Sequence, residues 1–354
     1  MQNDLIDSAK NVRQEDSLDK HKLSVYLSKH LHNFNVQDVL QIQQFPGGAS
    51  NLTYLIKWND QQAILRTAPR GANIKGAHDM GREFKVLNLL EGNFTYSPKA
   101  LLYCDDNEII GRAFYLMQKV TGIIPRKSFP MPVNPDLALT LCKDLIDVHV
   151  ALHDIDIKKA GLEDLGKGQG YIQRQVSGWN KRYTNALTQD SLAATELMQW
   201  LEDNQPNDTE TCLIHNDYKF DNVVLSESAP HKIIAVLDWE MTTIGSPLMD
   251  LGCSLAYWIE KNDPAEMQAL RMMPTHMDGM MTRQQIIEYY ANKRNLNVDG
   301  FYYFYVFGLF RLAVIVQQIY KRFALGKTTN PAFKHFGHLA NLLISMLMRW
   351  SLAL

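Results

Sequence analysis

The sequence predicts an α+β fold in which a small antiparallel sheet comes first and a larger, mainly helical region follows. Residues 39–118 contain short runs in which apolar and polar side chains alternate, as in half-buried strands. Beyond residue 132 the apolar residues instead recur with the period of a helix. A chain of 354 residues is also long enough for two lobes rather than one compact core.

The elements follow from these periods and from the breaks between them. The expected strands are Val39–Phe45, Leu52–Trp58, Gln62–Ala68, Ala100–Cys104 and Ala113–Gln118. The expected helices are Leu23–Leu31, His78–Leu90, Asp136–His153, Leu248–Glu260, Thr282–Lys293, Phe301–Arg322 and Ala332–Trp350. A charged turn is expected at residues 105–108. We place the lobe boundary in the linker that begins at Met117, which gives an N-lobe of residues 1–119 and a C-lobe of residues 120–354.

Composition limits the classes of function. A hydrophobic fraction of 46% and a formal net charge of −2 are those of an ordinary globular protein, so charge predicts neither a nucleic-acid nor a membrane partner. The first twenty residues hold no apolar segment of a secretory signal, and a cytoplasmic location is expected. The four cysteines are far apart and form no CxxC pair, so they are expected to be reduced and mostly buried. Composition predicts no oligomeric state.

One apolar segment, Phe301–Tyr320, has the length of a membrane span. It contains Gly308, Arg311, Gln317 and Gln318 and is rich in Tyr, and a charged side chain such as Arg311 is costly in lipid. A buried amphipathic helix is therefore the preferred interpretation.

Two stretches contain the residues for chemistry. In Leu213–Asn222, LIHNDYKFDN, a short polar loop lies between two buried segments. In Ile234–Glu240, IAVLDWE, an aliphatic run ends in Asp238, which places a carboxylate at the end of a strand. Two acids and an amide of this kind suit phosphoryl transfer from a nucleotide, in which one carboxylate orients the attacking hydroxyl and other oxygens hold Mg²⁺.

Each polar residue then has an expected role. Asp217 is expected to orient the hydroxyl and take its proton, and Lys219 to offset charge on the transferred phosphate. Asn222 and Asp238 are expected to bind Mg²⁺ through oxygen atoms. The alternative is an ordinary polar turn in which Asp217 and Asn222 serve only as turn residues.

These two stretches resemble the catalytic and metal-binding loops of the aminoglycoside phosphotransferase and choline kinase family, the small-molecule relatives of protein kinases. The resemblance covers residues from about 41 to 322 and implies a bilobal protein-kinase-like fold that uses ATP and Mg²⁺. The sequence departs from the family's His-Gly-Asp by having Asn216, and DWE replaces the Asp-Phe-Gly of protein kinases. Neither change removes a metal ligand.

The loop between the first two strands is expected to cover the nucleotide phosphates. Its adjacent glycines, Gly47 and Gly48, permit close backbone approach, and Ser50 and Asn51 could donate to a phosphate oxygen. The loop is not GxGxxG, and a tight hairpin turn explains the glycines equally well.

Four further residues are expected at the nucleotide. Arg66 stands where protein kinases have a lysine, and Glu83 on the next helix is its expected partner. An arginine here resembles the subgroup of this family that is fused to some acyl-CoA dehydrogenases. By the same resemblance, the linker residues Gln118 and Val120 are expected to offer backbone groups to adenine.

Helical spacing places a mixture of cationic and aromatic side chains on one face of residues 174–182. Arg174, Trp179 and Arg182 belong to this face, and the alternative is that they simply pack one helix against another. Arg174 and Trp179, with Glu240 and Arg311, are the expected acceptor contacts. The arginines and the resemblance to the fused subgroup together suggest a hydroxy acid or a hydroxyacyl thioester as the small-molecule acceptor.

Three more polar residues have structural explanations. Asp250 resembles the family's aspartate that supports the catalytic loop, and we do not count it as catalytic. His149 and His153 are one helical turn apart, but without a third ligand in the sequence we do not expect a metal there.

Two other functions remain open. One is an aminoglycoside or choline-type kinase. The other, of a different class, is a nucleotide-binding pseudokinase that acts as a scaffold, for which the Arg66 replacement is the sequence support.

Overall fold

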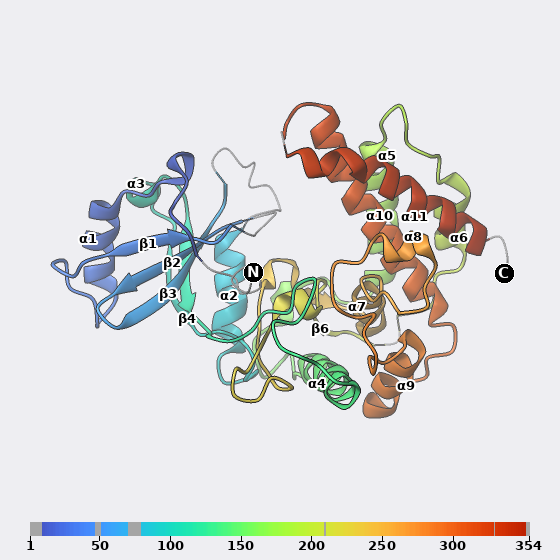
Figure 1. Ribbon diagram of the computed structural model, residues 1–354, viewed down its shortest axis with the longest axis horizontal. Coiled ribbons are helices and arrows are strands. Elements are labelled where there is room, and N and C mark those ends of the chain that lie inside the picture. Colours follow the sequence, from blue (N-terminus) through green and yellow to red (C-terminus); the bar gives the residue numbers. More distant parts are fainter. Residues whose placement is uncertain (1–8, 47–50, 70–78, 209, 329, 352–354) are drawn as a thin grey trace. The chain divides into compact units, whose positions relative to one another are not determined.

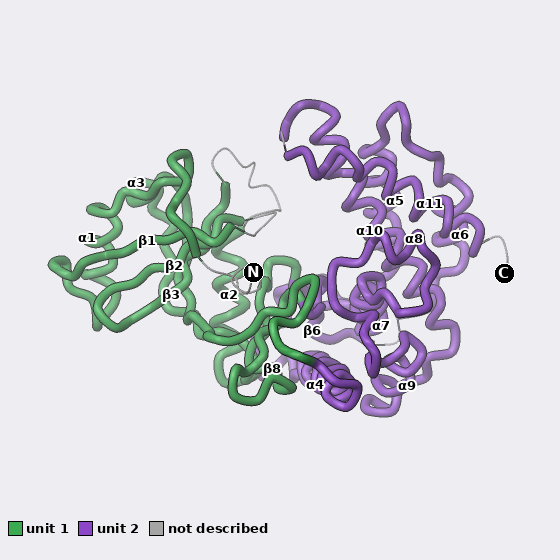
Figure 2. Tube along the Cα trace, viewed as in Figure 1, with its two compact units in different colours: residues 1–132, 221–241 green, residues 133–220, 242–354 purple. Residues whose placement is uncertain are grey.

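The computed structural model describes residues 9–46, 51–69, 79–208, 210–328 and 330–351. The chain forms two compact units, which Figure 2 shows in different colours. The first comprises Met1–Pro132 and Asp221–Met241, and the second comprises Val133–Phe220 and Thr242–Leu354. Each unit has its own core and is described by itself.

The first unit is built on a five-stranded antiparallel sheet with strand order β1-β2-β3-β5-β4 (Figure 1). The strands are β1 (Gln41–Gln44), β2 (Leu52–Trp58), β3 (Gln61–Thr67), β4 (Ala100–Cys104) and β5 (Phe114–Gln118). The hairpin from β2 to β3 turns at Asn59, whose φ of 47° is one that asparagine tolerates. Most of β3 and β5 is buried on both faces, so Arg66 in β3 lies inside this unit.

Helices cover the sheet. They are α1 (Lys20–His30), α2 (Met80–Leu90) and the short α3 (Asn107–Ile110), with the 3₁₀ turn η1 (Gln14–Asp16) before them. Leu23 and Leu27 of α1 are fully buried in a cluster with the side chains of the sheet. The charged turn expected at residues 105–108 is partly helical, because the Asp106 side chain accepts a hydrogen bond from the Glu108 N–H and starts α3.

A hairpin far along the sequence belongs to this first unit. It consists of β7 (Val223–Leu225) and β8 (Ile233–Val236), flanked by the 3₁₀ turns η3 (Phe220–Asn222) and η4 (Trp239–Met241). Backbone hydrogen bonds join Leu225 to Ile123, at 2.7 and 2.9 Å, and the Val236 N–H to the Tyr96 carbonyl, at 2.7 Å. The division into units therefore differs from the expected boundary after residue 119. The first unit continues to Pro132 and takes in this hairpin.

The second unit is mainly helical. Its α-helices are α4 (Pro135–His153), α5 (Tyr171–Ala186), α6 (Thr195–Asp203), α7 (Pro247–Leu255), α8 (Ala265–Gln268), α9 (Arg283–Arg294), α10 (Tyr302–Ala324) and α11 (Phe336–Ser351). The 3₁₀ turns η2 (Glu163–Leu165) and η5 (Pro331–His335) and the paired strands β6 (Cys212–Ile214) and β9 (Thr243–Gly245) complete it. Side-chain caps fix several helix starts, including Asn134 before α4, Ser246 before α7 and Thr282 before α9.

Two glycines set the crossing of α7 and α10. A Cβ atom on Gly308 would fall on the carbonyl oxygen of Gly252, and one on Gly252 would fall on the carbonyl oxygen of Phe304. The two helix backbones therefore touch at this point. The crossing brings Arg311, one turn after Gly308, near Cys253 in the last turn of α7 and Tyr257 just after it.

Helix α10 is, by length and composition, apolar enough to cross a membrane. It packs against α5, α7 and α11, and 61% of its most apolar window is buried inside the protein. Its buried Gln317 donates to the carbonyl of Ala186 and to the hydroxyl of Ser191, at 3.0 and 2.8 Å. These contacts are those of a core helix, the interpretation preferred from the sequence.

The four cysteines are all free and buried, as expected. Helix α6 was not expected from the sequence, and neither was the short α8.

The helix crossing gives a stability prediction. Replacing Gly308 with alanine forces two backbones apart, and we expect the free energy of unfolding to fall by about 1–3 kcal/mol. The matched control is Gly178→Ala in α5, where the nearest atom to an added Cβ is Arg182 Nη1 at 3.7 Å. That change should be neutral or should stabilise by up to about 1 kcal/mol. Urea denaturation of both variants measures these changes. Equal losses of unfolding free energy in the two variants would contradict a close backbone contact at Gly308.

Candidate active site

The first unit brings together the two expected metal ligands. Val223 pairs with Val236 in the hairpin of β7 and β8, and the Leu237 N–H donates to the Asn222 carbonyl at 2.8 Å. Asn222 comes directly before β7 and Asp238 shortly after β8, so both lie at the same end of the hairpin. Asp238 has a positive φ of 68°, a conformation that aspartate adopts at a small number of special sites.

Arg66 lies between two carboxylates in the same unit. Its Nη1 is 3.0 Å from Glu83 Oε1, and its Nη2 is 2.8 Å from Asp238 Oδ1. Burial alone would lower the pKa of Arg66, but the negative charges of Glu83 and Asp238 raise it well above its ordinary value. The arginine is therefore a permanent cation held beside one of the expected metal ligands.

Glu83 is the innermost member of this group. Its side chain is 1% exposed, and burial raises its pKa while Arg66 opposes the rise. The ion pair between Arg66 and Glu83 that the sequence suggested is present. An arginine thus makes the glutamate contact that a lysine makes in protein kinases.

Glu240 has a hydrogen-bond partner that the sequence did not suggest. Its Oε2 accepts a hydrogen bond from Asn51 Nδ2 at 2.8 Å, and Asn51 is buried at the start of β2. Glu240 therefore links the DWE segment to the end of the loop expected to cover phosphates, and its expected contact with the acceptor stays a prediction. Gly47, Gly48 and Ser50 lie outside the described residues.

The expected adenine contacts come at the end of β5. The Gln118 N–H donates to the Lys99 carbonyl at 2.9 Å, so this N–H is already used within the sheet. Val120 follows in the linker and is half-buried. Adenine binding by these two residues stays a prediction.

The second unit positions Asp217. Strand β6 ends at Ile214, and the loop that follows turns at Asn216, whose φ is 66°. Glycine and asparagine are the residues that adopt this left-handed conformation most readily, which explains why asparagine can stand in place of the family's glycine. The Asn216 side chain also accepts a hydrogen bond from the Tyr171 hydroxyl at 3.0 Å, which a glycine could not do.

Lys219 holds one oxygen of Asp217. The Lys219 Nζ lies 2.5 Å from Asp217 Oδ1, and the same ammonium group lies 4.7 Å from the centre of the Tyr257 ring. The side chains of Asp217 and Lys219 are 19% and 14% exposed, so both retain access to a ligand. The structure thus brings together the two residues expected to act on the transferred phosphate and its acceptor.

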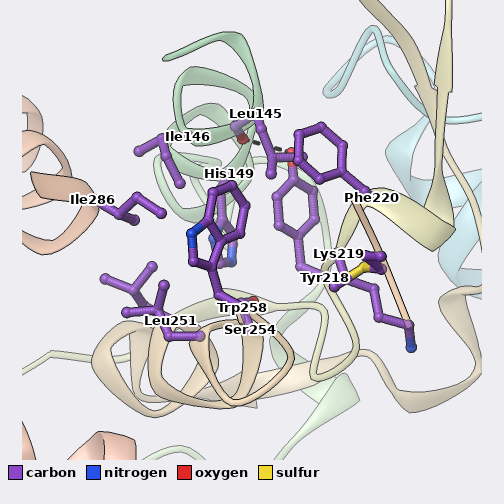
Figure 3. A pocket seen from close by; sticks show the side chains of 12 residues that line it. Leu145, Ile146, His149, Tyr218, Lys219, Phe220, Leu251, Ser254, Trp258 and Ile286 are labelled. Atoms are coloured by element: carbon purple, nitrogen blue, oxygen red, sulfur yellow. Dashed lines mark hydrogen bonds between the residues drawn. The ribbon is translucent and has the colours of Figure 1, made fainter. Parts of the chain in front are cut away.

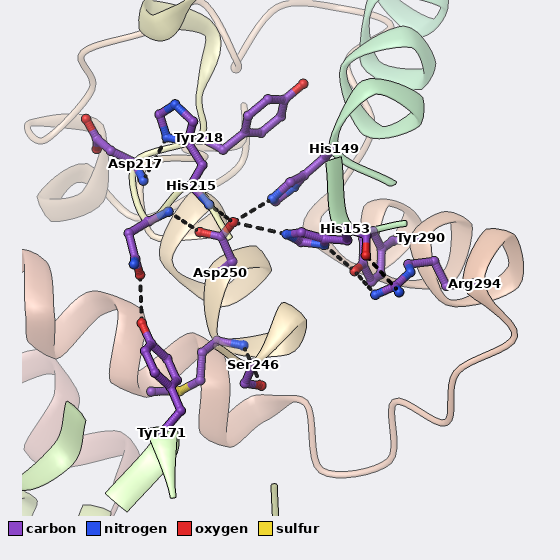
Figure 4. A network of polar contacts seen from close by, with 12 residues as sticks. His149, His153, Tyr171, His215, Asp217, Tyr218, Ser246, Asp250, Tyr290 and Arg294 are labelled. Atoms are coloured by element: carbon purple, nitrogen blue, oxygen red, sulfur yellow. Dashed lines mark hydrogen bonds and ion pairs between the residues drawn. The ribbon is translucent and has the colours of Figure 1, made fainter. Parts of the chain in front are cut away.

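A buried carboxylate supports this loop from below (Figure 4). Asp250 Oδ2 accepts from the His215 N–H at 2.9 Å, and Oδ1 accepts from the Asn216 N–H at 2.7 Å. His149 Nε2 and His153 Nε2 each lie 3.1 Å from Oδ2. Although burial opposes ionisation, these bonds hold the pKa of Asp250 well below its ordinary value.

The three groups His149, His153 and Asp250 have the composition of a metal site, with ligand atoms within 4.8 Å of one another. Sequence reasoning missed Asp250 as the third member. Both imidazoles must donate through Nε2 to the ionised carboxylate, and the N···O distances of 3.1 Å are those of hydrogen bonds rather than metal coordination. Tyr290 completes the set at 2.6 Å from His153 Nδ1. We assign this cluster to support of the loop.

The expected acceptor residues separate into two places. Arg174 donates to the carbonyls of Gln169 and Gly168, at 2.5 and 2.9 Å, so its guanidinium holds the turn before α5. Trp179 and Arg311 lie together, with the Arg311 guanidinium 5.3 Å from the centre of the indole ring. Trp179 and Arg311 are 6% and 3% exposed.

A pocket in the second unit lies behind the catalytic loop (Figure 3). It is lined mainly by apolar and aromatic side chains, among them Leu145, Tyr218, Phe220, Leu251 and Trp258. No carboxylate takes part in the lining, so we do not place phosphoryl transfer there.

Comparison with known proteins agrees with this arrangement. A model of the phosphotransferase enzyme family matches residues 41–280. Acyl-CoA dehydrogenase family member 11 of Rattus norvegicus is 34% identical over 337 residues, which cover 93% of this chain and 43% of the rat protein. Acyl-CoA dehydrogenase family member 10 of Mus musculus is 30% identical over 336 residues, which cover 94% of this chain and 31% of the mouse protein. The chain thus spans less than half the length of these relatives.

Solved structures share the fold. A Ralstonia eutropha protein classed as an aminoglycoside phosphotransferase has a TM-score of 0.80 and 27% sequence identity, and the match covers 95% of this chain and 99% of that one. Choline kinase of Cryptosporidium parvum has a TM-score of 0.64 and 12% identity, covering 94% and 95%. The resemblance inferred from the sequence and the protein-kinase-like α+β fold are both confirmed.

The buried histidine gives a prediction about pH. Burial, and next the neighbouring His149, lower the pKa of His153 from 6.5 to about 3. Between pH 6.5 and about 3, His153 is therefore protonated in the unfolded chain but neutral in the folded chain. The free energy of unfolding must then fall as the pH falls below 6.5. His153→Asn removes this titrating group. Within that pH range, we expect the free energy of unfolding to fall less steeply in the variant than in the wild type, by about 1.4 kcal/mol per pH unit. Denaturation at several pH values measures this, and equal slopes in both proteins would contradict it.

The left-handed residue in the loop gives a second prediction. Asn216→Gly keeps the backbone conformation and loses only the bond to Tyr171, whereas Asn216→Ala also introduces strain. We expect the alanine variant to be less stable than the glycine variant by about 1 kcal/mol. Thermal or urea unfolding of the pair decides this, and an alanine variant as stable as the glycine variant would show that the loop does not depend on this conformation.

Proposed function

Because the chain belongs to the phosphotransferase enzyme family, we propose that it is a small-molecule kinase that transfers the γ-phosphoryl group of ATP to a hydroxyl group, with Mg²⁺ as the metal ion. The observation that supports this most is the group at the end of the β7–β8 hairpin. There Asn222 and Asp238 come together and Arg66 lies 2.8 Å from Asp238. Asp217 is five residues before Asn222, so the chain itself keeps them within roughly 18 Å.

The donor set fits the proposed metal. The side chains of Asn222 and Asp238 offer an amide oxygen and a carboxylate oxygen, and hard oxygen ligands are those that Mg²⁺ prefers. When bound, the ion offsets negative charge on the phosphates. Asn222 and Asp238 would hold that ion, and through it they would orient the triphosphate.

Arg66 has two alternative partners in this proposal. In the structure it bridges Glu83 and Asp238. When a nucleotide binds, Arg66 Nη2 can donate to a phosphate oxygen in place of Asp238, while Nη1 stays bonded to Glu83. The bond to Glu83 would thus keep the cation in place, and Asp238, once released, would be able to hold the metal ion.

Asp217 acts on the acceptor. The acceptor hydroxyl gives its proton to the Asp217 carboxylate, and the hydroxyl oxygen forms the new bond to the γ-phosphorus. The bond from that phosphorus to the bridging oxygen breaks, and ADP leaves with the electron pair. Lys219 Nζ, 2.5 Å from Asp217 Oδ1, offsets negative charge on the phosphoryl group during its transfer.

The acceptor class is proposed from the cations of the second unit. Arg311 and Trp179 lie together there. Burial lowers the pKa of Arg311, but neighbouring groups that include the Asp217 carboxylate raise it above its ordinary value. A cation beside the base suits a hydroxy acid or a hydroxyacyl thioester. Relatives named acyl-CoA dehydrogenase family members agree with the second of these.

Two other functions are less well supported. Solved neighbours include phosphotransferases bound to hygromycin B or streptomycin, and an aminoglycoside kinase is the alternative they suggest. Polycationic acceptors and choline need carboxylates or open aromatic faces, whereas Trp179 here is already covered by arginine. A pseudokinase scaffold was suggested by Arg66, yet this residue makes the contact to Glu83 that a working site requires.

The division of roles can be tested with two substitutions. Asp217→Ala should reduce turnover by at least about 100-fold, since it removes the base, and should leave the affinity for Mg-ATP nearly unchanged. Asp238→Ala should abolish Mg²⁺-dependent nucleotide binding. Turnover is measured as γ-phosphate transfer to hydroxy acids, their thioesters, aminoglycosides and choline, and binding by calorimetry.

The matched control is Asp221→Asn. This acid lies in the same loop, but its carboxylate pairs with Arg126 at 3.1 Å. It should retain both turnover and binding. Survival of turnover within about tenfold in Asp217→Ala would refute the base assignment, and unchanged binding in Asp238→Ala would refute the metal assignment.

A further inference from the structure

We propose that Arg182, together with Trp179 and Arg311, forms a subsite that binds an anionic oxygen group of the acceptor, either a carboxylate or a phosphate. This inference rests on the proposed function, because it assigns the part of the acceptor that the same active site recognises. In the sequence, Arg182 was one of three arginines that suited an acidic acceptor, with no position relative to the other two. The structure separates it from Arg174 and places it with the buried arginine.

Two guanidinium groups share one indole ring. The Arg182 guanidinium lies 4.5 Å from the centre of the Trp179 ring, and that of Arg311 lies 5.3 Å from it. The Trp179 Nε1–H donates to Gln175 at 3.2 Å, which fixes the orientation of the ring. Attraction to the π-system stabilises each guanidinium beside the ring, but the two like charges repel each other.

The repulsion is visible in the pKa of Arg182. Burial lowers this pKa, and the charge of Arg311 lowers it further. Arg182 makes no hydrogen bond or ion pair with any residue in the described part of the chain, and its contact is the face of Trp179. A bound anion would remove the repulsion and supply the hydrogen-bond acceptors that the guanidinium fork lacks there.

The residue before Trp179 is a glycine. Gly178 is inside α5, where glycine costs roughly 0.5–1 kcal/mol relative to alanine. Apart from its chain neighbours and the helix backbone, a Cβ at this position would meet within 4 Å only the Nη1 atom of Arg182, at 3.7 Å. The guanidinium of Arg182 therefore lies over a position of the helix that has no side chain.

The patch also has a direction relative to the reaction. Arg311 is buried and interacts electrostatically with Tyr257 and Asp217, whereas Arg182 is exposed. The acceptor would thus place its hydroxyl at Asp217 and its anionic group at the arginines. The anion is the carboxylate in a free hydroxy acid, and a phosphate of the carrier in a coenzyme A thioester.

The test is Arg182→Gln, with Lys181→Gln as the matched control. Lys181 is the neighbouring exposed cation on α5. KM and kcat are measured at saturating Mg-ATP for short-chain hydroxy acids, their coenzyme A thioesters, and their pantetheine thioesters, which have no phosphate. Binding of the matching acids and thioesters without the hydroxyl group is measured in parallel by calorimetry, which needs no phosphoryl transfer.

We expect Arg182→Gln to raise KM for the anionic acceptor by about tenfold or more, with kcat changed by less than about threefold. The control should change neither value. An effect on the free acid alone identifies the carboxylate as the ligand group. An effect on the coenzyme A thioester but not the pantetheine thioester identifies a phosphate.

Equal KM values in wild type and Arg182→Gln would overturn the subsite, as would an equal effect on the pantetheine thioester. If no compound is phosphorylated, the proposed function fails, and the binding measurement still decides the subsite. Weaker binding of one anionic analogue to Arg182→Gln than to wild type would then support it. Equal binding, or no binding to the wild type, would refute it.

Discussion

The buried carboxylate of Asp250 is the interaction on which the catalytic loop depends. It accepts hydrogen bonds from two main-chain N–H groups, at His215 and Asn216, and from two imidazoles of α4. An ionised group with no exposure is tolerated only when such bonds replace its hydration. Because the loop N–H groups point inward to Asp250, the chain must turn at Asn216 in the left-handed conformation, and Asp217 follows on the open side of that turn.

The remaining polar residues form two self-contained groups. In the first unit, the hairpin of β7 and β8 carries Asn222 and Asp238 to Arg66, which Glu83 fixes from the opposite side. In the second unit, the contact of α7 and α10 at paired glycines brings Arg311 near Asp217. The chain passes from one group to the other between Phe220 and Asp221, so a single loop connects the proposed base to the proposed metal ligands.

Local sequence pattern was sufficient for the strands of the first sheet and for most long helices, because burial there follows the period of each element. The pair of Arg66 and Glu83 was also predicted, because the family resemblance supplied this long-range contact. Local pattern was not sufficient for Glu240, which contacts Asn51 across 189 positions of sequence. Nor could it place Arg311 of α10 against Trp179 of α5, because only tertiary packing brings these two helices together. The same limit hid Asp250 as the partner of His149 and His153.

The central claim is that Asp238 exchanges Arg66 for a metal ion when nucleotide binds. A crystal structure with Mg²⁺ and a non-hydrolysable ATP analogue tests it most directly. The account predicts a metal ion at about 2.0–2.1 Å from oxygens of Asn222 and Asp238. It also predicts that Arg66 contacts a phosphate and keeps its bond to Glu83. A nucleotide bound away from the β7–β8 hairpin, or a metal ion held without either residue, would contradict the account.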